Sequence, residues 1–284
     1  MPERGHLLDR LTQLWVKVTG RRVALADHPW LEGPVGPVER IGEQFFAELA
    51  DGHGLRARDA GAAHGLMPSF DELRCPGFDP SDVAEPISRF YEHTSSYRLD
   101  VWSQWSGPFR PFGWALARLF SRRLEQLNVP LTPLSTAAGM SSSIVQLEDP
   151  ASGSFRYTAW VRRNKQSGET IFAAGYSITP LPGHGQVVKV VFPLPNGNAT
   201  VLLRPIALDD GSLLLQSRGK RFGDPGFVFV VAGARDKAWV RYVSTFHETI
   251  RVFVDEAGEV RTDHDFHIWG RRFLRLHYRM LAAT

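Results

Sequence analysis

Residues 238–254 read AWVRYVSTFHETIRVFV, and in this run apolar side chains alternate with polar or charged ones. Successive side chains of a β-strand point to opposite faces of a sheet, so such alternation predicts a strand with one buried face. That face carries a largely apolar set with one acid in it: Val240, Tyr242, Ser244, Phe246, Glu248, Ile250, Val252 and Val254. The run therefore predicts a long β-strand whose buried face includes the carboxylate of Glu248.

The same period of two extends over the chain from about Met140 to Met280. Turn signals such as Asn196-Gly197 and Asp209-Asp210-Gly211 separate the apolar runs. Ten strands joined by short turns predict an antiparallel meander, and a sheet of that length must curl or close. We expect these strands at residues 141–148, 155–163, 170–178, 186–193, 199–206, 212–218, 226–232, 238–254, 260–268 and 272–280.

The N-terminal part shows a helical period instead of an alternating one. Helices are expected at residues 6–19, 38–50 and 112–127, and a further one begins at Glu85-Pro86. The predicted fold class is therefore α+β, with N-terminal helices packed on a C-terminal antiparallel β-barrel or highly curved sheet. The helical, loop-rich layer would span residues 1–135 and the sheet residues 136–284, as one integrated domain.

Composition excludes several functional classes. The 284 residues carry a net charge of +3 without a long Lys/Arg run, so no nucleic-acid partner is expected. Glycine-rich phosphate loops are missing, so no cofactor is expected. No stretch approaches the ~18 apolar residues of a membrane span, and no apolar signal core begins the chain. The lone cysteine, Cys75, fits a reducing cytoplasm.

Glu248 and His264 are the candidate catalytic residues. A hairpin centred on Ala257-Gly258 pairs residues whose numbers sum to about 515, which places His264 about one diagonal from Glu248. A buried carboxylate is costly unless it has a partner, and an imidazole beside it could exchange protons with a substrate. The alternative is a purely structural pair, or a bulge that turns one side chain outward.

Further residues are candidates for binding a ligand. Tyr242, Tyr278 and Arg204 would be interior polar groups, while Trp102 and Trp105 would line an apolar pocket or, alternatively, the core between helices and sheet. The leading prediction is a protein that binds a small, mostly apolar or amphipathic molecule. The alternatives are an acid–base cyclase, isomerase or hydrolase that uses Glu248 and His264, and an interaction module that uses the Arg-rich last strand.

Two other chemistries fit the sequence less well. Asp263, Asp265 and His267 share the outer face of one strand and could hold a metal ion, but an exposed polar strand face is far commoner, so no metal is expected. The segment 139–143 reads GMSSS and lacks the last glycine of the nucleophile elbow of serine hydrolases.

Three segments together resemble a known family. They are residues 90–97 with Trp102 and Trp105, residues 126–131 (QLNVPL) and residues 192–198 (FPLPNGN). In this order they resemble the soluble C-terminal part of the YndJ-like family of bacterial proteins, over about residues 88–280. The resemblance implies no catalytic residue, because that family has no assigned chemistry. The resemblance also implies a membrane region joined to this part, but these residues include no such region and we expect no membrane role for them.

Overall fold

The computed structural model describes residues 7–36, 50, 54–59, 64–107, 140–164, 170–234 and 236–282. Fourteen strands of these residues form one sheet, and every ladder between them is antiparallel. The first three strands come from the N-terminal part: β1 (Arg21–Ala24), β2 (Arg56–Asp59) and β3 (Tyr97–Trp105). The others are β4 (Met140–Glu148), β5 (Phe155–Asn164), β6 (Thr170–Leu181), β7 (Gly185–Leu194), β8 (Gly197–Ala207), β9 (Leu213–Gln216), β10 (Gly226–Ala232), β11 (Lys237–Tyr242), β12 (Phe246–Val254), β13 (Val260–Ile268) and β14 (Arg271–Ala282).

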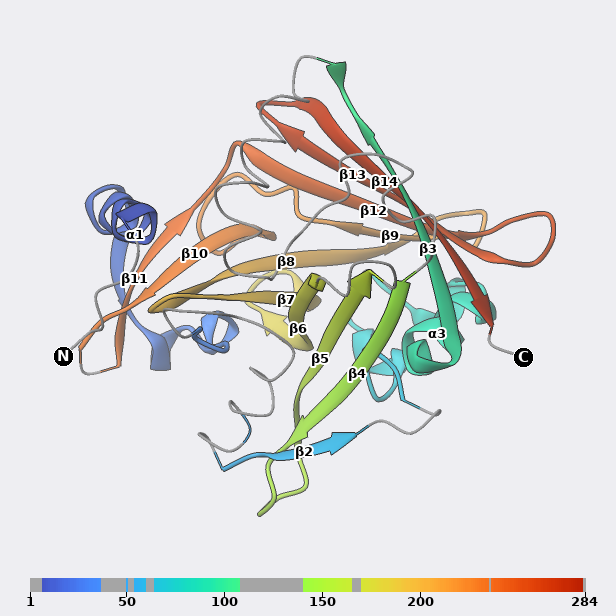
Figure 1. Cartoon of the computed structure of the whole chain (residues 1–284), viewed down its shortest axis with the longest axis horizontal. Coiled ribbons are helices and arrows are strands. Elements are labelled where there is room, and N and C mark those ends of the chain that lie inside the picture. Colours follow the sequence, from blue (N-terminus) through green and yellow to red (C-terminus); the bar gives the residue numbers. More distant parts are fainter. Residues whose placement is uncertain are drawn as a thin grey trace.

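The main path of the sheet runs β2-β4-β5-β6-β7-β8-β9-β12-β13-β14-β3. The long strand β8 is the point at which the sheet forks. Its first half pairs with β10 through residues 197–202, and its second half pairs with β9 through residues 204–207. Strand β11 then pairs with β10 and with β1. In Figure 1 the strands β12, β13 and β14 lie above and β4 and β5 below, with β7 and β8 between them.

The predicted fold class is wrong in two respects. The sheet does not close into a barrel, and the structure is mostly antiparallel sheet with two α-helices in the described part of the chain. Strand β3 approaches β4, but no ladder joins the two. One reason is that β2 already occupies the outer edge of β4, where it pairs with residues 145–148. We call the resulting open, folded-over sheet the trough.

The strand expected at residues 238–254 is also corrected, because the chain divides it into β11 and β12. Val243, Ser244 and Thr245 form a turn between them, in which the Val243 amide donates to the Phe227 carbonyl at 2.9 Å. Strand β11 pairs with β10 on the side branch, whereas β12 pairs with β9 and β13 on the main path. A single straight strand cannot pair with strands of both branches, so the chain turns where the sheet forks.

Two predicted helices are confirmed, α1 (Leu7–Thr19) and α3 (Glu85–Glu92). The helices expected at residues 38–50 and 112–127 lie almost wholly or wholly outside the described residues. In α1 the side chains of Leu11, Leu14 and Val18 are exposed, while Val16 is buried. Five short 3-10 helices complete the described elements: η1 (Leu25–Asp27), η2 (Pro29–Leu31), η3 (Phe70–Leu73), η4 (Pro80–Asp82) and η5 (Thr94–Ser96).

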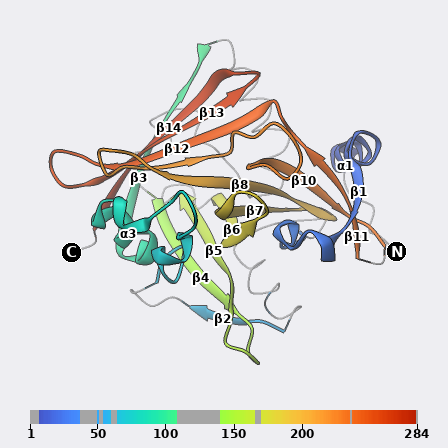
Figure 2. The same cartoon turned by 180° about the vertical axis from the view of Figure 1, so that it is seen from behind.

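The helical elements lie at the two ends of the trough. Helix α1 packs beside β10 and β11, while α3 contacts β12 and β13. Figure 2 shows the same arrangement from behind, with β2 at the lower edge. The centre of the sheet is buried on both faces, since consecutive residues of β7 and β8 such as Val187, Val188, Leu202 and Leu203 are all buried. Strands from both sides of residue 135 share this sheet, and the boundary between 1–135 and 136–284 stays a prediction.

Candidate functional site

The concave face of the trough encloses a cavity of about 660 Å³. This volume lies within the range of about 300–1,000 Å³ typical of sites for small organic molecules. Leu66, Phe90 and Tyr91 border it near α3, and residues of α1, such as Trp15 and Val16, border it at the other end. Its wall is mostly aromatic and aliphatic, and includes Trp105, Trp160, Phe192, Leu203, Leu215 and Ile250.

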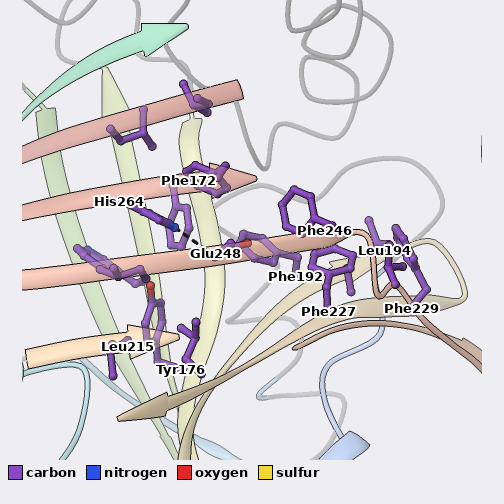
Figure 3. A pocket seen from close by; sticks show the side chains of 18 of the residues that line it. Phe172, Tyr176, Phe192, Leu194, Leu215, Phe227, Phe229, Phe246, Glu248 and His264 are labelled. Carbon is purple, nitrogen blue, oxygen red and sulfur yellow. Dashed lines mark hydrogen bonds and ion pairs between the residues drawn. The ribbon is translucent and has the colours of Figure 1, made fainter. Parts of the chain in front are cut away.

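Phenylalanine rings line one part of this wall. Phe227 lies at 5.1 Å from Phe229 and at 5.1 Å from Phe246, each measured between ring centroids with the rings edge to face. Phe192, from β7, faces the same region (Figure 3). Edge-to-face contacts are a favoured packing of aromatic rings, so these side chains form an ordered apolar wall.

Glu248 and His264 interrupt the apolar wall. Strands β12 and β13 pair with residue numbers that sum to 514, so Glu248 stands opposite Phe266 and His264 opposite Ile250. The two side chains therefore lie on one face, one diagonal apart. His264 Nε2 is 3.2 Å from Glu248 Oε2, the contact dashed in Figure 3. Glu248 is only 8% exposed, so the imidazole provides the polar partner that a buried carboxylate needs.

The backbone of Glu248 is fixed by Ser217, the residue that follows β9. The Ser217 amide donates to the Glu248 carbonyl at 3.0 Å, and the Glu248 amide donates to Ser217 Oγ at 2.7 Å. The ring of His264 stacks on Phe266, with 3.9 Å between the centroids. Both members of the pair are thus held in place. Because Nε2 of His264 faces Glu248, its Nδ1 is the nitrogen left for any proton transfer to a bound molecule.

Arg162 is a second charged group on the cavity wall. It lies on β5, is 7% exposed, and stacks on Trp160 with its guanidinium carbon 3.5 Å from the ring centroid. Trp160 is anchored by its indole Nε1, which donates to Ser142 Oγ at 2.7 Å. Tyr278 lies beside the guanidinium, at 5.0 Å. Burial raises the pKa of the Tyr278 hydroxyl, and the charge of Arg162 opposes that increase.

The structure places two of the five predicted ligand-binding residues at the cavity. Tyr278 and Trp105 line it. Trp102 is 42% exposed on the outer face of β3, where it lies 6.0 Å from the ring of His277. Arg204 is exposed as well, near Gly77. The interior positions predicted for Trp102 and Arg204 are thus not observed, because each side chain points to the outer face of its strand.

Tyr242 lies away from the cavity too. Its hydroxyl donates to the Pro225 carbonyl at 3.1 Å, and its ring covers Gly219 and Gly226, where any side chain would collide with it. Burial raises the pKa of Tyr242 to about 12. The turn at residues 243–245 explains this position, because it ends the alternation that would have put Tyr242 on the face of Glu248.

On the outer face, acids pair with the arginines of the last strand. Arg275 forms two hydrogen bonds to Asp265, both of 2.7 Å, and His277 Nδ1 is 2.8 Å from Asp263. The metal site considered for Asp263, Asp265 and His267 has no support here. Within the described ranges, no three His, Cys, Asp or Glu side chains gather in a way that could hold a metal ion.

Sequence reasoning missed Arg162, Tyr176 and Ser217. Arg162 had a readable signal, because it lies two residues after Trp160 on the same face of a predicted strand. Tyr176 similarly follows Phe172 at even spacing on β6, and its ring is 5.5 Å from Trp160. Ser217 had no such signal in the sequence, because its role depends on the pairing of β9 with β12, two strands separated by a branch of the sheet.

Comparisons with models of protein families, with curated proteins and with solved structures find no match. The resemblance to the YndJ-like family therefore stays a prediction. None of the helices in the described ranges has the length and apolar character that crossing a membrane requires.

Proposed function

We propose that this protein binds a small, mostly apolar molecule in the cavity of the trough. The observation that carries the proposal is the cavity itself, about 660 Å³ with a wall dominated by aromatic and aliphatic side chains. Burying apolar ligand surface there would contribute roughly 25 cal/mol per Å². The few polar groups on the wall would orient the ligand, as in most sites of this kind. The single cysteine keeps a reducing cytoplasm as the proposed location.

The test uses N-phenyl-1-naphthylamine, an uncharged probe whose fluorescence increases in an apolar environment. We expect saturable binding to the intact protein. Ile250→Trp should weaken this binding at least tenfold, equivalent to about 1.4 kcal/mol, because the larger side chain occupies part of the cavity that Ile250 lines.

Thr249→Trp is the matched control, since Thr249 is the neighbouring residue of β12 and does not line the cavity. This variant should bind the probe like the wild type. Circular dichroism and thermal unfolding establish that both variants fold. A wild-type protein that does not bind the probe, or equal binding by the Ile250→Trp variant, would contradict the proposed function.

A second candidate function is acid–base catalysis on a molecule bound in the same cavity. The contact between Glu248 and His264 on the cavity wall favours it. In this scheme Glu248 orients the imidazole and Nδ1 of His264 transfers the proton. The test incubates wild type and Glu248→Gln with a panel of apolar esters, epoxides and ketones, followed by mass spectrometry. Identical product profiles for the two proteins would rule this candidate out.

A further inference from the structure

The guanidinium of Arg162 is a cation held at the wall of an apolar cavity. Its faces contact aromatic rings, with the guanidinium carbon 3.5 Å from the ring centroid of Trp160 and 5.2 Å from that of Phe172. Such contacts stabilise a cation by about 0.5–2 kcal/mol. They engage the faces of the guanidinium, whereas its hydrogen bonds form in its plane, where the neutral hydroxyl of Tyr278 accepts one from Arg162.

The positive charge of the guanidinium is not neutralised by this hydroxyl. In the part of the chain that the structure describes, no carboxylate lies within ion-pair distance of Arg162. Its Nε is buried and has no hydrogen-bond acceptor there. Burying a cation without a counter-ion costs several kcal/mol, more than the aromatic contacts return. The cost is removed when an anion enters the cavity and meets the guanidinium.

We propose that the cavity takes an apolar carboxylate, whose head pairs with Arg162 and whose hydrocarbon part lies against the phenylalanine wall. This inference rests on the proposed function and names the class of ligand. The planar fork of a guanidinium matches the two oxygens of a carboxylate. A single arginine suits one negative charge, and the buried carboxylate of Glu248 on the same wall would oppose a doubly charged phosphate.

The experiment measures displacement of N-phenyl-1-naphthylamine by three ligands of equal chain length, dodecanoate, dodecanol and dodecyl phosphate, at pH 8 and below their micellar concentrations. Dodecanoate should displace the probe from the wild type at a concentration about 10–100-fold lower than dodecanol, the gain expected for charge-assisted hydrogen bonds. Dodecyl phosphate should be weaker than dodecanoate. In Arg162→Met the advantage of dodecanoate over dodecanol should disappear.

Arg156→Met is the matched control, because Arg156 lies on the same strand, is exposed and pairs with Asp149 at 3.5 Å. It should keep the full preference for dodecanoate. Arg162→Lys keeps the charge without the fork and should retain a smaller preference, which preserves the test if Arg162→Met does not fold.

Each contrary outcome has a distinct meaning. A probe that does not bind the wild type contradicts the proposed function and this inference together. If the probe binds but dodecanoate and dodecanol displace it equally well, only the proposal that the ligand is a carboxylate is contradicted. The same holds for stronger displacement by dodecyl phosphate, or for a dodecanoate preference that Arg162→Met retains.

Discussion

Tyr242, Glu248 and His264 were predicted for the same buried face, but only Glu248 and His264 share it. The side chains of Glu248 and His264 meet because the hairpin of β12 and β13 is regular from Phe246 to Ile268. In a regular ladder, successive residues point to opposite faces of the sheet, so this contact could be predicted from the residue numbers. Tyr242 lies beyond the turn at 243–245, where the alternation no longer holds.

The new position of Tyr242 makes it a structural residue. We predict that Tyr242→Phe lowers the free energy of unfolding by about 1 kcal/mol, because the Pro225 carbonyl loses its hydrogen-bond donor. Binding of N-phenyl-1-naphthylamine should be unchanged, since the ring does not line the cavity. Urea unfolding and probe titration measure the two effects. A variant with unchanged stability and weakened probe binding would show that the side chain faces the ligand.

At the scale of elements, the C-terminal strands could be predicted because turns that contain glycine, asparagine or aspartate separate them. The hairpin at Asn196-Gly197 is an example: Gly197 pairs with Leu194, and Asn196 at the tip has a φ of 58°, a left-handed conformation that asparagine tolerates. Strand β3 also carried a signal, since Leu99 and Val101 are buried and Arg98 and Trp102 exposed. The dense aromatic residues of that segment obscure this alternation in the sequence.

The pairing of strands could not be predicted where the sheet forks. Strand β8 divides its hydrogen bonds between β10 and β9, and a sequence pattern shows which face is buried but not which neighbour is chosen. The break at residues 243–245 follows from that choice, because β11 and β12 belong to different branches.

The outer face of the last hairpin provides a prediction about pH. Hydrogen bonds from Arg279 hold the pKa of the Glu259 carboxyl below its usual value. A carboxyl with a lowered pKa stabilises the folded state at pH above its unfolded pKa of about 4.3, and this contribution is lost as the pH falls through the lower, folded value. Arg279→Met should therefore be less stable than the wild type at pH 6.

The difference between the two proteins should shrink as the pH falls from the unfolded pKa of about 4.3 through the lower pKa of Glu259 in the folded wild type, below which this carboxyl is protonated in both proteins. Urea unfolding at a series of pH values from 3 to 7 measures this difference. A difference in unfolding free energy that stays constant down to pH 3 would contradict the assigned pair.

At the scale of the whole molecule, the open trough replaces the expected barrel. A predicted strand count indicates that a long sheet must curve, but not whether its ends will pair. Here β2 takes part of the edge that β3 would need, so the sheet stays open and its concave face borders the cavity. The apolar interior was thus predictable from alternation, whereas its boundary depends on a four-residue strand that no pattern indicated.

The central claim is that an apolar molecule occupies this concave face. Nuclear Overhauser contacts between N-phenyl-1-naphthylamine and methyl-labelled protein test it most directly. The account predicts contacts to methyl groups of Leu203, Leu215 and Ile250, which line the cavity. It predicts none to Leu11, Leu14 or Val18, which are exposed on α1 and do not line it. Contacts confined to those three residues of α1 would contradict a ligand site inside the trough.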